Sequence, residues 1–177
     1  MIYLVRHGEA AAGWGDHPDP GLSDLGHKQA AAVADTLLKL GATSLINSPM
    51  QRCRETAAPF AAALKATPRV EPAVSEIVTP PGIDDRVSWL RTLMQGQWPA
   101  DMQGWRRSAY EAVDTLPAQT AVFSHFVAIN AIIGEVTGQN QVLVFKPGHC
   151  SVTILARDQQ GRLALESLGD EAATRIL

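Results

Sequence analysis

Short apolar runs alternate along the chain with longer segments in which apolar residues recur every three or four positions. The short runs have the length of buried strands, and the longer segments have the period of amphipathic helices. Strands are predicted at residues 2–5, 44–47, 121–124, 152–156 and 163–167, with 70–74 as a further extended segment. Helices are predicted at residues 23–40, 49–65, 84–95, 99–116 and 126–136. Strands that alternate with helices predict an α/β fold, a three-layer α/β/α sandwich around a mostly parallel sheet.

Capping residues mark the ends of the first two predicted helices. Ser23 suits the N-cap of the first helix, and Gly41 suits its end. For the second helix, Ser48 suits the N-cap and Pro49 the first helical position, and Gln51 completes a capping box. We therefore expect the second helix to begin directly after Ser48.

Two connections and one helical insertion interrupt the alternation. Residues 9–21, rich in Gly, Ala, Pro and Asp, and residues 77–83, with the sequence IVTPPGI, are predicted to be loops. Residues 84–117 hold two helices with no strand between them, so we expect a small helical cap over one end of the sheet. A chain of 177 residues is long enough for one hydrophobic core, and residues 1–177 are predicted to form a single domain.

Composition and charge exclude several classes of protein. The formal net charge is -3 and no basic stripe occurs, so a nucleic acid is not expected as a partner. No signal-peptide pattern and no apolar run of about 20 residues are present, so a membrane is not expected either. Cys53 and Cys150 match no metal or redox spacing and are predicted to be reduced thiols. These features predict a cytoplasmic protein.

Charged and imidazole side chains follow three of the predicted strands. Arg6 and His7 end the first strand, Arg52 lies on the first turn of the helix after the second, and His125 ends the strand at 121–124. Ligands of open α/β sheets bind beyond the carboxyl ends of the strands, so we expect these four residues to meet in one pocket. Two guanidinium groups, two imidazoles and nearby helix N-termini suit a tetrahedral dianion such as a phosphate group.

Phosphoryl transfer would give each of these groups a task. His7 is the candidate nucleophile, because nearby arginines favour a neutral imidazole and Gly8 leaves the backbone room for close approach. The fixed charge of the arginines can compensate the transition state, so no metal ion and no cofactor are expected. An ester leaving group needs a proton donor, for which Glu76 is the first choice. The alternative carboxyl groups are those of Glu9, Asp16, Asp84 and Asp85.

The remaining histidines and arginines have simpler interpretations. His149 lies near a turn without a partner at metal-ligand spacing, so no metal site is predicted. His17 and His27 are expected at the surface. Four arginines of the helical insertion could contact an anionic substrate, although a solvated helical face is the simpler interpretation. They are Arg86, Arg91, Arg106 and Arg107.

Four segments of the sequence carry a family resemblance. They are RHGEA at 6–10, LSDLGHKQA at 22–30, SPMQRCRETA at 48–57 and FSH at 123–125. In this order they resemble the histidine phosphatase superfamily, the phosphoglycerate-mutase-like group that also contains small phosphatases. The closing segment GHCSVTIL resembles the final core strand of that family.

The resemblance implies specific roles for the residues that match. Arg6 and Arg52 match the two phosphate-binding arginines, and His7 matches the nucleophile that becomes a phosphohistidine. His125 matches the second histidine, which holds the transferring phosphoryl group. Glu76, in the segment PAVSEI, matches the acidic proton donor.

The sequence also departs from the family pattern. Residues 77–83 replace the Gly-x-Trp-Glu-Gly segment of many members, and Phe126 and Val127 follow the second histidine where many members have glycine. The chain is also short for a mutase. We therefore predict a metal-independent hydrolase of a small-molecule phosphate monoester. The alternatives are a protein phosphohistidine phosphatase, a phosphoglycerate-type mutase and a phosphate-binding module without turnover.

Overall fold

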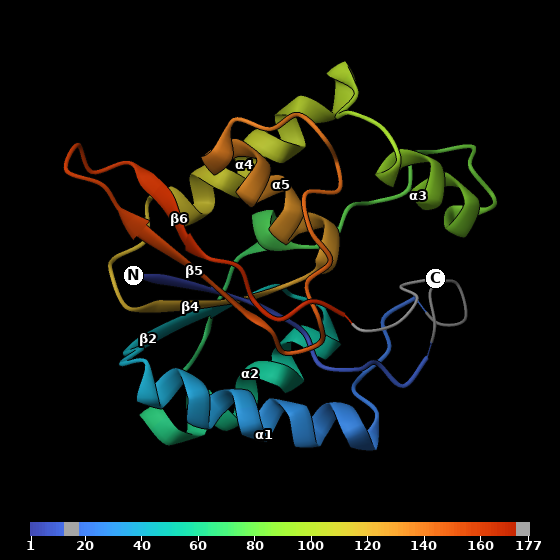
Figure 1. The fold of residues 1–177 in the computed structure, drawn as a ribbon. Coiled ribbons are helices and arrows are strands. Elements are labelled where there is room, and N and C mark those ends of the chain that lie inside the picture. The colour runs from blue at the N-terminus through green and yellow to red at the C-terminus, as the bar shows by residue number, and fades with distance from the viewer. Residues whose placement is uncertain (13–17, 173–177) are drawn as a thin grey trace.

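A six-stranded sheet forms the centre of the computed structural model, which describes residues 1–12 and 18–172 (Figure 1). The strands are β1 (Ile2–Arg6), β2 (Ser44–Asn47), β3 (Arg69–Val70), β4 (Thr120–Ser124), β5 (Val152–Arg157) and β6 (Leu163–Ser167). Their order across the sheet is β3-β2-β4-β1-β5-β6. The strands from β3 to β1 are parallel, and β5 is antiparallel to both of its neighbours. The predicted mostly parallel sheet is confirmed.

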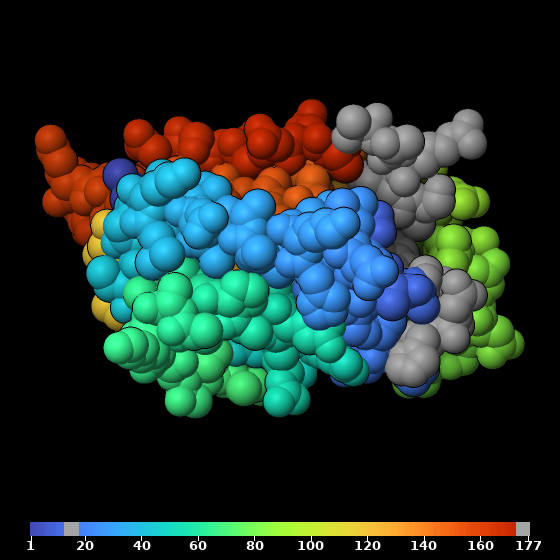
Figure 2. All heavy atoms as spheres, turned by 90° about the horizontal axis from the view of Figure 1, so that it is seen from below, coloured from blue at the N-terminus to red at the C-terminus, as the bar shows by residue number. Residues whose placement is uncertain are grey.

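Helices cover both faces of the sheet, as predicted for a three-layer sandwich. Helices α1 (Asp24–Lys39) and α2 (Gln51–Leu64) lie side by side on one face, which Figure 2 shows from below. Helices α4 (Gln103–Asp114) and α5 (Phe126–Thr137) lie on the opposite face (Figure 1). None of the described helices is long and apolar enough to cross a membrane.

The helical stretch 84–117 divides between two environments. Helix α4 packs along α5, and its buried residues Ala109 and Val113 belong to the core on that face of the sheet. Helix α3 (Arg86–Met94) stands apart from both layers in Figure 1 and belongs to a separate cluster that includes Trp98. The assignment of residues 1–177 to one domain, with 84–117 as an insertion, stays a prediction.

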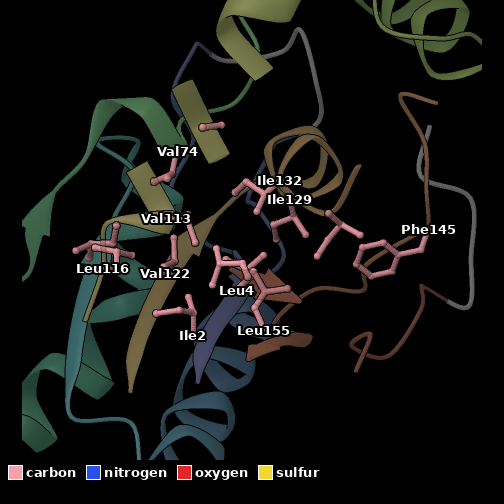
Figure 3. Packing of buried hydrophobic residues seen from close by; sticks show 14 residues of the cluster. Ile2, Leu4, Val74, Val113, Leu116, Val122, Ile129, Ile132, Phe145 and Leu155 are labelled. Carbon is pink, nitrogen blue, oxygen red and sulfur yellow. The ribbon is translucent and has the colours of Figure 1, made fainter. Parts of the chain in front are cut away.

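The alternation of side chains along β1 shows how one strand serves two cores. Ile2 and Leu4 face α4 and α5, where they pack with residues such as Val122 and Leu155 (Figure 3). Tyr3 and Val5 face α1 and α2 in the second core. All of these side chains are buried, because a strand between two helical layers has no solvent-facing side. The fully apolar run Ile2–Val5 is the sequence signature of this position.

Helix α2 begins two residues later than predicted. The helix begins at Gln51 with Met50 as N-cap, so Pro49 is not the first helical residue. The backbone N–H of Gln51 donates to the carboxylate of Asp19, at 2.9 and 3.1 Å from its two oxygens. A carboxylate from the loop before α1 thus caps the helix in place of the Ser48 hydroxyl. The start of α1 is as predicted, with the Ser23 hydroxyl accepting from the N–H of Gly26 at 3.0 Å.

The extended segment predicted at 70–74 is correct only at its beginning. Strand β3 covers Arg69 and Val70, and a short 3₁₀ turn, η1 (Pro72–Val74), follows. Pro72 has no N–H to donate to a strand ladder, and the Glu71 carboxylate accepts from the N–H of Ala73 at 3.2 Å. A second 3₁₀ turn, η2 (Ala100–Met102), precedes α4 within the predicted helix 99–116.

Truncating Leu4 in the middle of β1 is expected to destabilise the protein. The side chain is fully buried, so Leu4→Ala removes apolar contacts and leaves a cavity, at a cost of about 2 to 5 kcal/mol in the free energy of unfolding. Leu38→Ala is the matched control, because Leu38 on α1 is 42% exposed and should change the free energy by less than about 0.5 kcal/mol. Urea unfolding of the two variants measures this difference, and equal losses would contradict the assigned core.

Candidate active site

The carboxyl ends of β1 and β4 lie next to each other because the two strands pair in parallel register. Arg6 is opposite Ser124, so His7 and His125, the residues that follow, lie at the same edge of the sheet. The backbone N–H of His7 donates to the Ser124 carbonyl at 3.0 Å, and the two imidazole centroids are 5.3 Å apart. Arg52, on the first turn of α2, reaches His125 from the neighbouring strand end. The structure brings the four predicted residues together.

His7 is buried and held in one tautomer. Its Nδ1 lies 2.7 Å from the Gly8 carbonyl oxygen, which can only accept, so Nδ1 carries the proton and donates. The unprotonated nitrogen of the neutral ring is therefore Nε2, the atom with a free lone pair. Burial, followed by the charges of Arg52 and Arg6, holds the pKa of His7 well below its ordinary value.

Gly8 permits a close approach between the His7 loop and α1. A Cβ at Gly8 would lie 2.8 Å from the carbonyl oxygen of Gly26, which belongs to the first turn of α1. The N–H of Gly8 donates to the Thr56 hydroxyl on α2 at 3.0 Å. The close approach predicted at Gly8 is therefore made by the first turn of α1. This contact fixes the backbone that carries His7.

His125 is also buried and neutral, with the opposite tautomer. A guanidinium group can only donate, so Arg52 Nη2 donates to His125 Nδ1 at 3.0 Å, and the ring proton is on Nε2. This Nε2–H donates to the Ser48 hydroxyl at 2.8 Å. Burial, then His7 and Arg52, lowers the pKa of His125 well below its ordinary value. Arg52 thus sets the tautomer of His125, and the Ser48 hydroxyl, predicted as a helix cap, accepts the ring proton.

The two arginines have different surroundings. Arg6 is buried, and its Nη1 donates to the Pro147 carbonyl at 2.8 Å while its Nε has no partner among residues 1–12 and 18–172. Burial lowers the pKa of Arg6 to about 10, and the charge of Glu76 opposes this shift. Arg52 forms an ion pair with Asp19 at 3.8 Å. Both guanidinium groups remain charged at neutral pH and lie beside the two imidazoles.

Glu76 is buried beside this cluster at the N-terminus of α5. One carboxylate oxygen accepts from the N–H of Ile77 at 3.0 Å, and the other accepts from the N–H of Val127 at 3.3 Å. Burial raises the pKa of Glu76, and the two backbone hydrogen bonds oppose that shift. A buried carboxyl group with a raised pKa beside two arginines and two histidines has the properties of a general acid.

The competing carboxyl groups have other surroundings. Glu9 accepts from the Ser23 hydroxyl at 2.7 Å, and Asp85 caps α3 through the N–H of Ser88 at 3.0 Å. Asp84 is exposed. Asp16, like His17, lies outside the described residues. Within the described part of the chain, Glu76 is the one buried carboxyl group.

The structure also places His149 beside these residues, although the sequence indicated no role for it. It lies just before β5, its ring centroid is 6.0 Å from that of His7, and its Nε2 is 3.1 Å from Arg6 Nη2. The pairing of β5 with β1 was the available signal, because it brings residues just before β5 to the end of β1. Cys53 and Cys150 are free thiols, as predicted.

Two arginines of the helical insertion do not lie on a solvated helical face. Arg106 is buried and donates to the Gln139 carbonyl and the Asn140 side chain, so it joins α4 to the end of α5. Arg86 is half-buried and donates to the Ile77 carbonyl at 2.9 Å, which holds the loop after Glu76. The described residues contain no group of three His, Cys, Asp or Glu side chains that could hold a metal ion.

Comparisons with known proteins agree with this fold and motif order. Residues 2–80 match the sequence model of the histidine phosphatase superfamily (branch 1). A probable phosphoglycerate mutase, GpmB of Erwinia tasmaniensis, is 27% identical over 96% of this chain and 93% of its own. A mycobacterial glucosyl-3-phosphoglycerate phosphatase has the same fold, with a TM-score of 0.77 at 19% identity over 97% of this chain and 99% of its own. Phosphoserine phosphatase from Entamoeba histolytica gives 0.75 at 19% identity over 96% of each chain.

The lowered pKa of His7 predicts a dependence of stability on pH. The unfolded state gains a proton on this ring below its ordinary pKa of 6.5, whereas the native state does not, so the free energy of unfolding should fall as the pH falls. The contribution is up to about 1.4 kcal/mol per pH unit. The raised pKa of Glu76 acts in the opposite direction, so a variant must isolate the His7 contribution.

Urea unfolding between about pH 7.5 and about pH 5 measures this contribution for the parent and for His7→Asn. The variant should lose less stability on acidification than the parent does. His27→Asn is the control for the same replacement at an exposed position, because the His27 side chain is 58% exposed. Identical slopes in the parent and His7→Asn would contradict a neutral, buried His7.

Proposed function

We propose that the chain, which matches the histidine phosphatase superfamily over residues 2–80, hydrolyses a small-molecule phosphate monoester through a phosphohistidine at His7. The observation that carries the proposal is the hydrogen bond from His7 Nδ1 to the Gly8 carbonyl. This bond leaves the lone pair on Nε2, and the pKa of the buried ring is lowered, so the nucleophile is already deprotonated at neutral pH.

The proposed reaction has two steps in which the same groups exchange roles. In the first, His7 Nε2 attacks phosphorus, the bond from phosphorus to the ester oxygen breaks, and Glu76 gives its proton to that oxygen. In the second, water attacks the phosphohistidine, the N–P bond breaks, and the Glu76 carboxylate takes the proton from water. Phosphate and the alcohol are the products, and the enzyme returns to its starting state.

Charge compensation in this mechanism comes from the protein. Arg6 and Arg52 are buried and positively charged, so they are suited to the equatorial oxygens of the phosphoryl group. His125 contacts Arg52 through Nδ1 and lies beside His7, so its Nε2–H is a further donor suited to the same oxygens. Phosphoryl transfer needs positioning and charge compensation more than covalent chemistry, and these four groups can supply both without a metal ion.

A protein phosphohistidine is the second candidate substrate. The surroundings of Glu76 support this alternative. Both carboxylate oxygens accept backbone N–H bonds, and these bonds stabilise the ionised form. Phosphohistidine has an imidazole leaving group, which depends less on a proton donor than an alcohol does. A mutase would follow the same first step and pass the phosphoryl group to a second alcohol instead of water.

Hydrolysis of a panel of phosphate esters in the presence of EDTA tests the nucleophile. The parent should release phosphate without added metal, and His7→Ala should lose at least about a thousandfold in rate, because the first bond-forming step is removed. His27→Ala, which removes an exposed histidine, should keep the activity of the parent. An alkaline quench with mass spectrometry should trap one phosphoryl group on His7 in the parent. A fully active His7→Ala would rule out the mechanism.

The dependence on the leaving group tests Glu76. Glu76→Gln cannot give a proton, so it should lower the rate toward alkyl phosphates by about 100- to 10,000-fold and lower it much less toward p-nitrophenyl phosphate. Steady-state rates on both esters measure the ratio. Loss on alkyl phosphates with full activity on a phosphohistidine peptide would favour the protein substrate. An equal loss on all esters would contradict the role of Glu76 as the acid.

A further inference from the structure

His149 is an imidazole in the pocket for which the mechanism has no task. It lies on the segment 138–151 between α5 and β5, and its ring is only partly buried, unlike those of His7 and His125. Its Nε2 is 3.1 Å from Arg6 Nη2. Since the guanidinium group can only donate, Nε2 is the acceptor and the ring proton is on Nδ1. His149 is therefore a neutral hydrogen-bond acceptor for the first phosphate-binding arginine.

Two groups of the segment 138–151 accept hydrogen bonds from the terminal nitrogens, Nη1 and Nη2, of Arg6. The Pro147 carbonyl accepts from Nη1 at 2.8 Å, and His149 accepts from Nη2. The ring of Phe126 lies below the guanidinium carbon, 5.2 Å from it to the ring centroid. Of the three N–H groups that remain, the one on Nε is buried and has no partner within the described ranges. A buried donor without a partner is costly, so this edge of Arg6 is the one suited to an incoming oxyanion.

We propose that His149 is a positioning residue for Arg6: it fixes the guanidinium group so that the Nε edge faces the phosphoryl oxygens. The inference rests on the proposed function, because it assigns Arg6 to the phosphoryl group. His149 acts through Arg6 and does not take part in bond making. Its removal should therefore weaken the binding of phosphate more than it slows the chemical step.

The backbone around His149 is fixed by contacts that do not involve its side chain. The N–H of Gly148 donates to the Asp170 carbonyl at 2.8 Å, and a Cβ at Gly148 would lie 3.0 Å from that oxygen. Cys150 has a φ of 55°, a left-handed conformation that is uncommon for a residue with a side chain. Its N–H donates to the Arg6 carbonyl at 3.0 Å. A substitution at His149 should therefore change the contact with Arg6 and leave the turn in place.

The charge state of His149 fits an acceptor. Burial and the charge of Arg6 lower the pKa of His149 to about 4, and the charge of Glu9 opposes this shift. The ring is therefore neutral at neutral pH, and its Nε2 can accept. A glutamine at this position also presents an acceptor oxygen near the place of Nε2, whereas it cannot act as a nucleophile or an imidazole base. Glutamine and alanine therefore separate positioning from direct chemistry.

Calorimetric titration with inorganic phosphate tests the proposal without requiring turnover. His149→Ala should weaken phosphate binding by about tenfold, since one hydrogen bond to a charged group is lost, and His149→Gln should stay within about threefold of the parent. His27→Ala, which removes a different exposed histidine, should bind as the parent does. On any ester that the parent hydrolyses, His149→Ala should raise KM more than it lowers kcat.

Nitrogen NMR of the histidine rings gives an independent readout. The Nε2 of His149 should have the shift of an unprotonated nitrogen at neutral pH, and that shift should move in Arg6→Lys. A protonated Nε2, an alanine variant that binds phosphate as the parent does, or a glutamine variant as weak as alanine would each overturn the proposal. Phosphate binding without hydrolysis in the parent would refute the proposed function alone, because the binding comparison still decides the role of His149. No phosphate binding in the parent would overturn both.

Discussion

The parallel pairing of β1 with β4 is the constraint on which the site depends. It sets Arg6 opposite Ser124, and the next residue of each strand is then a histidine at the same edge. A shift of one residue in this register would move every side chain of β1 to the other face, so Ile2 and Leu4 would exchange cores with Tyr3 and Val5. The two apolar cores therefore determine the distance between His7 and His125. The geometry of the site is a consequence of the packing of the sheet.

Concentrating two arginines and two histidines in a buried pocket has an electrostatic consequence. Charge repulsion and burial both disfavour protonation of the imidazoles, so the histidines lose their charge and the arginines keep theirs. The arginines retain hydrogen bonds or ion pairs with Pro147 and Asp19, which offset part of the cost of burial. The result is a cluster with fixed positive charge and neutral imidazoles, which is the combination that the proposed attack on a phosphate dianion requires.

The sequence was sufficient for the elements of the fold and for the residues at the strand ends, because both follow from local patterns. The strand at 2–5, the N-cap at Ser23 and the helix end near Gly138 depend only on neighbouring residues. Apart from the local turn at Pro72, the errors arose where a distant segment supplied a hydrogen bond. The carboxylate of Asp19 caps α2, which released Ser48 to bind His125, and no local pattern around Ser48 indicates this exchange. His149 was missed for the same reason, because its partner Arg6 is 143 residues away in the sequence.

The residues beside the proposed phosphate site form a hydrophobic cluster of their own. Ile77, Trp98 and Phe126 belong to a cluster with α3 that is separate from the two clusters against the sheet. Substitutions in this cluster can therefore reshape the wall beside Glu76 without changing the register of β1 and β4. The residues proposed for the phosphoryl group depend on the sheet, whereas the wall that a leaving group would contact depends on the segment 77–98 and on α5. Recognition of the phosphoryl group and recognition of the leaving group thus depend on different cores. The proposed nucleophile, His7, can therefore serve different esters when only the residues beside Glu76 change.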